Sequence, residues 1–503
     1  MSDTSGRGER EIVLAVVAPL GSPTAETLTA FEEAFVGRGY SVGHVRVSEL
    51  IDANVPGDPS WKDLPRIERL MNKGDRWRTD LEDDAVGAYT AATAIAALRE
   101  LQTGSTSEHR PRFVTLVRSL KTPGEVRALR QIYGQRVLVV GVGASHDERL
   151  AGLKRTLLEE GWEGSQLTAK ASALLERDEK DESQRYGQRG SDAYRLCDAF
   201  IAVRRQDDSK TVSDFVDLVL GEPWKTPSRD EQGMFHAWAA KFRSSAAGRQ
   251  VGAALVDSDG ELLAVGCNDV PKPGGGQYWP GDADDRRDFQ LQEDANDAGK
   301  LGAARSLMSA LKEHGWLSAE HAETPSAFLA EKALDDGGPL SVSEFDDLIE
   351  YGRIVHAEMA ALMTAARTGR SVRGSTLYTT TYPCHECARL IIGAGITRVC
   401  FVDPYPKSRA PVLFHEMFDD TGLPGRVRVD PFQGVSPRLF ARVYEMVNRT
   451  KDVGGRYAQW ERKHLLTTDE ELADSIPLQE EAAAALLDTQ LAGGAPEPEQ
   501  PAG

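Results

Sequence analysis

The chain has few cysteines and no long apolar segment, and both shortages limit where it can work. Its 503 residues include only 5 cysteines, an odd number that fits a reducing compartment better than a disulfide scaffold. No apolar run approaches the roughly 20 residues of a membrane span, and residues 1–10 lack the apolar core of a signal peptide. We therefore expect a cytoplasmic protein without a membrane partner.

Basic residues are also in short supply. The chain carries 59 Lys and Arg against 78 Asp and Glu, which gives a net charge of −19. This balance argues against a general affinity for nucleic acid phosphates, which needs a basic surface, although a local basic groove is compatible with it. Hydrophobic residues make up 40% and charged residues 27%, as is ordinary for a globular protein long enough for two domains.

The most informative stretch is a histidine-glutamate pair followed by two cysteines. It reads His-Ala-Glu at 356–358 and Pro-Cys-His-Glu-Cys at 383–387. A catalytic zinc ion takes three protein ligands and keeps one position for water. His356, Cys384 and Cys387 supply one imidazole and two thiolates, and a first helical turn after the proline favours the thiolate form. The order is the signature of zinc nucleobase and nucleoside deaminases, so we predict a Zn²⁺ site.

Glu358 is not needed as a ligand, and its place beside His356 suits a general acid and base. It would take a proton from water, pass it to the ring nitrogen N3 and later protonate the leaving ammonia. The alternatives are a redox Cys-x-x-Cys pair or half of a structural zinc site. A structural site needs four ligands, and the chain has no second Cys-x-x-Cys; Cys197, Cys267 and Cys400 are isolated in apolar runs and are interpreted as core.

The first half of the chain alternates strand-like and helical patterns. A buried-strand run at 11–17 precedes a helical pattern at 25–37, and a helical pattern at 123–133 lies between two further strands. This alternation predicts a parallel α/β sheet. We place this domain at 11–225, after a disordered N-terminus at 1–10.

The loop after the first strand occupies the place of a phosphate-binding loop. It keeps Gly21 but lacks the first glycine and the lysine of G-x-x-x-x-G-K-[S/T], so phosphoryl transfer is not expected. Backbone N–H groups around Gly21, Ser22 and Thr24 could still hold an anion. The domain is therefore either a nucleotide-binding, regulatory domain or a purely structural one.

Two groups of basic residues in this half could meet phosphates or lie on solvated helix faces. One group falls within 66–78, and the other consists of Arg118, Lys121, Arg127 and Arg130.

The second half predicts a mixed sheet covered by helices. A helix and a β-hairpin come first, then a helix with His-x-Glu, a strand, a helix with Cys-x-x-Cys and another strand. We place this domain at 226–450, with an insertion at 271–350 that is a candidate for substrate selection or oligomer contact. Residues 451–503 form an acidic tail whose end we expect to be disordered.

Three residues are candidates for contact with a substrate. Asn268 ends the second hairpin strand, where its amide could bond a sugar hydroxyl, although asparagine at a strand end is often only a turn residue. Ala357 lies between the histidine ligand and the catalytic glutamate. Lys407 follows the last strand at its carboxyl end, where it could meet substrate phosphates or simply be solvated.

The second half resembles the deoxycytidylate deaminase family in its zinc motif and in Gly266-Cys267-Asn268. The two-domain arrangement resembles the bacterial anti-phage dCTP deaminases, which join a P-loop kinase-like domain to a deoxycytidylate-deaminase-like one. The matching stretches lie at 118–121, 186–189 and 267–276. The resemblance implies an α/β fold: an N-terminal parallel-sheet, P-loop-like domain followed by a cytidine-deaminase-like three-layer α/β/α domain.

The resemblance also implies an activity. That activity is zinc-dependent hydrolytic deamination of dCTP, with dCMP as a further substrate, which drains the dCTP pool as antiviral defence. A homo-oligomer and a regulatory RNA or nucleotide partner are expected with it. The alternatives are a housekeeping dCMP deaminase, a polynucleotide cytidine deaminase and a non-enzymatic sensor with structural zinc. The long first half counts against a housekeeping dCMP deaminase, and the acidic charge counts against a polynucleotide deaminase. The retained Glu358 counts against a structural zinc site.

Overall fold

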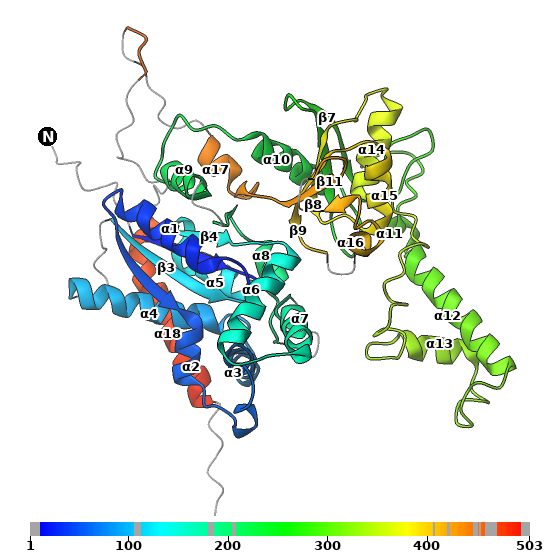
Figure 1. Cartoon of the computed structure of the whole chain (residues 1–503), viewed down its shortest axis with the longest axis horizontal. Helices are drawn as coiled ribbons and strands as arrows, with labels where there is room; N and C mark the ends of the chain where they lie inside the picture. Colours follow the sequence, from blue (N-terminus) through cyan, green and yellow to red (C-terminus); the bar gives the residue numbers. More distant parts are fainter. Residues whose placement is uncertain are drawn as a thin grey trace, which may run out of the picture. The chain divides into compact units, whose positions relative to one another are not determined.

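The protein consists of two compact units, seen in a computed structural model (Figure 1). Residues 1–231 and 431–503 form the first unit, and residues 232–430 form the second. The structure describes residues 11–104, 112–179, 186–203, 208–405, 408–419, 423–445, 451, 454–457 and 470–493.

The division differs from the predicted domains at the C-terminal side. The predicted start of the second domain, at residue 226, lies close to the observed division after residue 231, but residues 431–450 belong with the first unit rather than the second. The reason is that the chain returns to the first sheet after residue 430 and adds a strand to it. The predicted disorder at 1–10 and at the end of the tail lies outside the described residues.

The first unit is built on a sheet of order β12-β5-β4-β1-β3-β2. Strands β1 to β5 are parallel, and β12 is antiparallel to β5. The central strand β1 is buried along its whole length, as expected for a strand covered by helices on both faces. The strands are β1 (Ile12–Val17), β2 (Ser41–Arg46), β3 (Phe113–Leu120), β4 (Val137–Gly141), β5 (Ala199–Phe200) and β12 (Gly434–Val435).

Helices connect these strands, and local sequence signals set several of their ends. Thr122 and Glu125 form a capping box at the start of α5, with Pro123 as its first residue. The observed helix spans the predicted residues 123–133. The helices of this unit are α1 (Thr24–Val36), α2 (Val47–Asn54), α3 (Arg66–Asp80), α4 (Val86–Thr103), α5 (Pro123–Tyr133), α6 (His146–Glu159), α7 (Ser165–Glu179), α8 (Gly190–Tyr194), α9 (Ser209–Val219), α17 (Phe440–Tyr444) and α18 (Glu470–Gly493).

The C-terminal helix α18 packs against α4 (Figure 1). Arg99 of α4 donates to Glu480 of α18 at 2.9 Å and to Glu11 at 3.0 Å, and the Tyr133 hydroxyl donates to Glu480 at 2.8 Å. All four residues are buried. The acidic tail predicted from composition therefore contains a docked helix, because one guanidinium satisfies two carboxylates that water no longer reaches.

The second unit has its own sheet, of order β10-β11-β9-β8-β6-β7. Its hairpin β6–β7 is antiparallel, β6 is antiparallel to β8, and β8 is parallel to β9. The strands are β6 (Gly252–Val256), β7 (Leu262–Cys267), β8 (Thr376–Thr381), β9 (Arg398–Asp403), β10 (Phe418–Asp419) and β11 (Val427–Pro431). The main helices are α10 (Arg229–Lys241), α14 (Ala357–Arg367), α15 (His385–Gly393) and α16 (Ala410–Leu413).

Two glycines let helices approach opposite faces of this sheet. A Cβ atom at Gly252 would lie 2.0 Å from the Ala237 carbonyl oxygen of α10, and one at Gly266 would lie 2.3 Å from the Ala357 carbonyl oxygen of α14. Gly252 pairs with Cys267 while Gly266 pairs with Ala253, so the two glycines point to opposite faces. The unit is thus a three-layer α/β/α sandwich, and the predicted fold class is confirmed for both halves.

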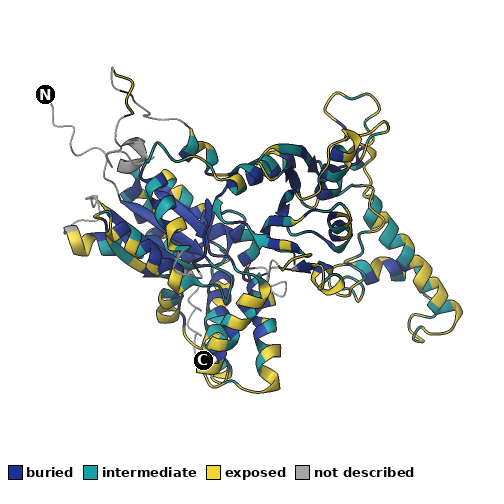
Figure 2. Cartoon of the chain, turned by 45° about the horizontal axis from the view of Figure 1, so that its top comes forward, coloured by how far each residue is buried: buried dark blue, intermediate teal, exposed yellow. Residues whose placement is uncertain are grey.

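The stretch predicted as an insertion holds three helices, α11 (Asp288–Leu291), α12 (Ala295–Glu313) and α13 (Ser326–Leu334). Helix α12 packs against α13, yet Trp316 is 79% exposed and Phe328 is 52% exposed. Figure 2 shows how much of this hairpin faces solvent. Its suggested role in substrate selection or oligomer contact stays a prediction.

Across the parts of the chain that the structure describes, no helix combines the length and the apolar character needed to cross a bilayer.

The buried network around Arg99 makes a direct test of the docked C-terminal helix possible. Glu480→Ala should lower the free energy of unfolding of the first unit by about 3 kcal/mol, because it leaves a buried guanidinium short of one partner. Glu481→Ala changes an exposed neighbour on the same helix and should have little effect. Urea unfolding followed by tryptophan fluorescence measures both, and equal midpoints for the two variants would contradict the docking.

Candidate metal centre

Two helix N-termini in the second unit bring the predicted ligands together. His356 is the N-cap residue of α14, and Cys384 is the N-cap residue of α15. The Cys384 sulfur accepts a hydrogen bond from the Cys387 backbone N–H at 3.5 Å, which places both cysteines on the first turn of α15. The free N–H groups and the dipole of these turns favour negatively charged sulfur.

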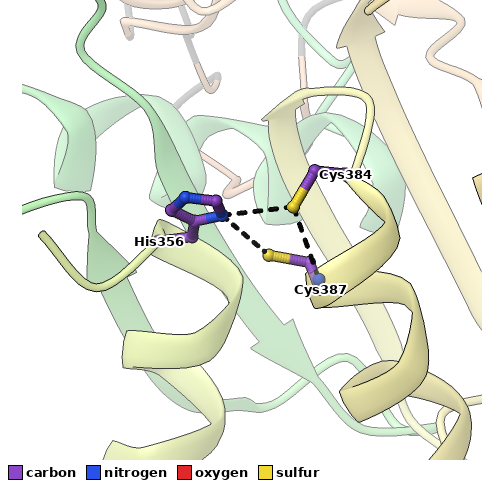
Figure 3. Close-up of side chains that lie close together, drawn as sticks. All are labelled: His356, Cys384 and Cys387. Carbon is purple, nitrogen blue, oxygen red and sulfur yellow. Dashed lines mark hydrogen bonds between the residues drawn. The ribbon is translucent and has the colours of Figure 1, made fainter. Parts of the chain in front are cut away.

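The three side chains converge on one point (Figure 3). Nδ1 of His356 lies 3.2 Å from Sγ of Cys384 and 3.4 Å from Sγ of Cys387. The three ligand atoms lie within 4.8 Å of one another, and both cysteines are buried. The structure therefore assembles the three residues that the spacing predicts.

The donor set and its size fit zinc. Tetrahedral zinc with Zn–S near 2.3 Å and Zn–N near 2.0–2.1 Å holds nitrogen and sulfur roughly 3.6 Å apart, close to the separations found here. One imidazole and two thiols are also the ligand types that zinc prefers. The cofactor is zinc, and His356, Cys384 and Cys387 are the residues that would hold it.

Of the three ligand residues, only Cys384 is favoured in its deprotonated, metal-binding form without a metal. Hydrogen bonds from Cys387 and His356 lower the pKa of the Cys384 thiol to about 4, and the hydrogen bond with Cys384 raises the pKa of His356 to about 9. The Cys387 pKa lies well above its usual value, because its thiol bonds to Cys384 and is buried. One thiolate is thus favoured before a metal arrives, and metal binding displaces the remaining protons.

Glu358 lies on the first turn of α14 with a buried carboxyl group. The Thr379 hydroxyl lies 3.0 Å from Oε1 of Glu358, and Cys387 Sγ lies 3.4 Å from Oε2. Burial raises the pKa of Glu358, while the His356 charge and the Thr379 hydrogen bond oppose that rise. The carboxyl group is held beside the metal ligands and remains outside the ligand group itself.

Thr379 was not predicted as a site residue. It stands on β8 in a run of three buried threonines, Thr379 to Thr381. Its hydroxyl also lies 3.0 Å from the Thr381 carbonyl oxygen. The available signal was this polar run inside a buried strand, because buried hydroxyl groups need partners.

Two of the predicted substrate contacts, Asn268 and Ala357, have structural roles in the second unit. Asn268 donates through Nδ2 to the Arg249 carbonyl oxygen at 2.7 Å and accepts from the Val251 N–H at 2.6 Å. These bonds tie the end of β7 to the start of β6 and use one N–H and one lone pair of the amide. Ala357 is fully buried at the start of α14. Substrate contact by either residue stays a prediction, and Lys407 lies outside the described residues.

The predicted phosphate contacts belong to the first unit, not to the unit that holds the metal cluster. Gly21 has φ +78°, and Thr24 bonds only back to the Ser22 carbonyl, at 3.3 Å. The N–H of Leu20 in this loop donates to Asp178 at 2.7 Å.

Asp178 accepts hydrogen bonds from donors in and beside this loop. Its fully buried carboxyl group also accepts from Lys121 at 2.7 Å, and Lys121 reaches the Ala18 carbonyl oxygen at 3.0 Å. A carboxylate of the chain itself therefore bonds to one N–H of this loop, that of Leu20, while the Ser22 hydroxyl is buried without a hydrogen-bond partner among the described residues. A phosphate role for Gly21, Ser22 and Thr24 stays a prediction.

Comparison with known families points to one class of zinc site. Residues 227–403 match the family described as the cytidine and deoxycytidylate deaminase zinc-binding region. This range contains the whole ligand cluster and Glu358. This part of the chain is therefore similar to the zinc-binding region of cytidine and deoxycytidylate deaminases.

Curated relatives share the same region. The deoxycytidylate deaminase of Enterobacteria phage T2 is 40% identical over 55 residues, which is 11% of this chain and 29% of the phage protein. The deoxycytidylate deaminase of Pongo abelii is 39% identical over 75 residues, 15% of this chain and 41% of that protein. The chain thus spans well under half the length of these relatives.

Solved structures resemble parts of the chain only weakly. A dCMP deaminase from the cyanophage S-TIM5 is 17% identical with a TM-score of 0.22, over 41% of this chain and 99% of that one. A shikimate kinase from Acinetobacter baumannii is 16% identical with a TM-score of 0.23, over 44% of this chain and 97% of that one. Likenesses of this strength carry no argument about function.

Zinc content separates the ligands from the neighbouring carboxylate. Cys384→Ser and Cys387→Ser should each lose most bound zinc, since each removes one of three protein ligands, whereas Glu358→Ala should keep it. Cys400→Ser, a buried cysteine outside the cluster, serves as the matched control. Metal analysis of purified protein measures the ratio of zinc to chain, and loss of zinc in Glu358→Ala would show that the carboxylate is a ligand after all.

Proposed function

We propose that the protein hydrolyses deoxycytidine nucleotides, dCTP and also dCMP, to deoxyuridine nucleotides and ammonia. The observation that carries this proposal is a buried carboxylate, Glu358, beside a metal cluster of three ligands among the described residues. A structural zinc site closes with four protein ligands, whereas a catalytic one keeps a position for water. The family of residues 227–403 supports the same conclusion.

The residues of the site suit the proton transfers that this reaction needs. In the reaction a C4–O bond forms with water, the C4–N4 bond breaks, and cytosine plus water become uracil plus ammonia. Glu358 takes a proton from water and delivers it to N3, and it then carries a further proton to the departing amino group. Zinc, when bound, lowers the pKa of water toward about 7.

Thr379 positions the Glu358 carboxylate for these transfers. Its hydroxyl lies 3.0 Å from Oε1 of Glu358 and 3.0 Å from the Thr381 carbonyl oxygen, and its single hydrogen serves one acceptor at a time. The hydroxyl can donate its hydrogen to the charged carboxylate. When Glu358 is protonated, the hydroxyl can accept a hydrogen bond from it and donate to the Thr381 carbonyl oxygen instead.

The proposed substrates are free nucleotides. The curated relatives are named deoxycytidylate deaminases. The choice of dCTP follows from the resemblance of the two-domain arrangement to anti-phage dCTP deaminases, and with it come a defensive role through dCTP depletion, a homo-oligomer, and control by RNA or nucleotide. The net charge of −19 favours free nucleotides over a polynucleotide substrate.

A substrate panel tests this proposal. Zinc-loaded protein is incubated separately with dCTP, dCMP, deoxycytidine, CTP and single-stranded DNA, and uracil products are measured by chromatography. We expect conversion of dCTP and of dCMP, and none by Glu358→Ala. Conversion of dCMP alone would favour a housekeeping deoxycytidylate deaminase, and conversion of DNA alone would overturn the free-nucleotide proposal.

The Thr379 hydroxyl is tested by a pair of variants. Thr379→Val should lower kcat about tenfold with little change in KM, because one hydrogen bond to a charged group is lost at the reacting centre. Thr379→Ser keeps the hydroxyl and should recover most of the rate. Steady-state kinetics on dCMP, with zinc content measured on the same samples, reports both; equal rates for Val and Ser would mean that the hydroxyl does not position Glu358.

A further inference from the structure

Two arginines stand side by side at the carboxyl ends of β2 and β3 in the first unit. Arg46 pairs in register with Arg118, and paired residues on neighbouring strands point to the same face, about 4.8 Å apart. Like charges on directly paired residues of neighbouring strands repel each other, and a bound anion would relieve that repulsion. Accordingly, burial and the charge of Arg46 lower the pKa of Arg118.

The Arg118 side chain makes no ion pair and no hydrogen bond within the described part of the chain, and its Nε is buried without a partner. Four other enclosed cations of this unit form short ion pairs instead: Arg78 with Asp75 at 2.5 Å, Lys121 with Asp178 at 2.7 Å, Arg149 with Glu179 at 2.6 Å, and Arg177 with Asp75 at 2.6 Å.

Glu49 is exposed and bonds to Arg46 at 2.5 Å. That bond and the fields of Arg46, Arg118 and Arg66 lower the pKa of Glu49. This one carboxylate thus interacts with three arginines, while the Arg118 side chain makes no ion pair of its own among the described residues.

The backbone beside Arg118 is strained. Ser119 has φ +77°, a conformation that residues with a side chain adopt at an energetic cost and that collects at functional sites. The pairing of β3 with β1 shifts register at this point. As a result the Ser119 hydroxyl lies 3.2 Å from the hydroxyl of Ser48, next to the arginine pair.

The arginine pair lies at the carboxyl ends of strands next to the switch point of the sheet. The connections of this sheet reverse direction at β1, between β3 and β4, and ligands of open parallel sheets lie outside the carboxyl ends of strands near such a point. In the loop after β1, the N–H of Leu20 bonds to Asp178. At the ends of β2 and β3, Arg118 is left without an ion pair among the described residues.

We propose that Arg46, Arg118, Ser48 and Ser119 form a phosphate-binding site of the first unit, separate from the deaminase centre. The ligand class is a phosphate group, carried either by inorganic phosphate or by a nucleoside 5′-phosphate. The two guanidinium groups supply charge-assisted hydrogen bonds to its oxygens, and the two hydroxyls supply further donors.

Calorimetric titration of the full-length, zinc-loaded protein tests the site. The probes are inorganic phosphate and adenosine 5′-monophosphate, which has no cytosine to engage the deaminase centre. Arg118→Ala should weaken binding of the better probe at least about tenfold, the effect of one lost charge-assisted contact. Arg127→Ala removes an exposed arginine of α5, whose nearest carboxylate, Asp84, lies 3.8 Å away, and should leave binding unchanged.

Arg46→Ala provides a second test because Arg46 is a third exposed and its loss is less able to disturb the fold. Tighter binding of adenosine 5′-monophosphate than of phosphate assigns the site to nucleotides, and the reverse order assigns it to the free anion. Absence of binding of both probes to the unaltered protein overturns the proposal. So does equal binding by Arg46→Ala, Arg118→Ala and Arg127→Ala.

Discussion

The meeting of two helix N-termini beside strand β8 is the constraint on which the site depends. Helix α14 brings His356 and Glu358, and α15 brings Cys384 and Cys387. Helix α14 can approach because Gly266 of β7 has no side chain. A Cβ atom at residue 266 would lie 2.3 Å from the Ala357 carbonyl oxygen of α14. The three candidate metal ligands, the Glu358 carboxyl group and two helix N-termini thus share one small volume, where the N-terminal dipoles favour negatively charged sulfur.

The first unit depends on a different interaction, the packing of segments that follow residue 430 onto its sheet and helices. Strand β12 extends the sheet beside β5, and α18 covers α4 through the Arg99 network. A buried guanidinium between two carboxylates is stable only while all its partners stay in place. Segments from before and after the second unit in the sequence therefore fold together as the first unit.

Charge is distributed unevenly within that first unit. Asp178 and its neighbours neutralise the cations around the β1 loop, where sequence patterns suggest a phosphate. The cations at the ends of β2 and β3 are left with one exposed glutamate. Lys121 beside the β1 loop is thus paired with Asp178, whereas Arg118 at the end of β3 has no ion pair among the described residues.

The sequence by itself determined which residues form the metal centre, because His-x-Glu and Cys-x-x-Cys supply zinc-preferring ligands at the starts of helices. It also determined both sheets, through buried β-strand runs and capping signals such as Thr122 and Glu125. Only the tertiary structure decided the return of residues 431–503 to the first unit, the role of Thr379 and the occupation of the β1 loop by Asp178. These depend on contacts between residues far apart in the chain, which no local pattern records.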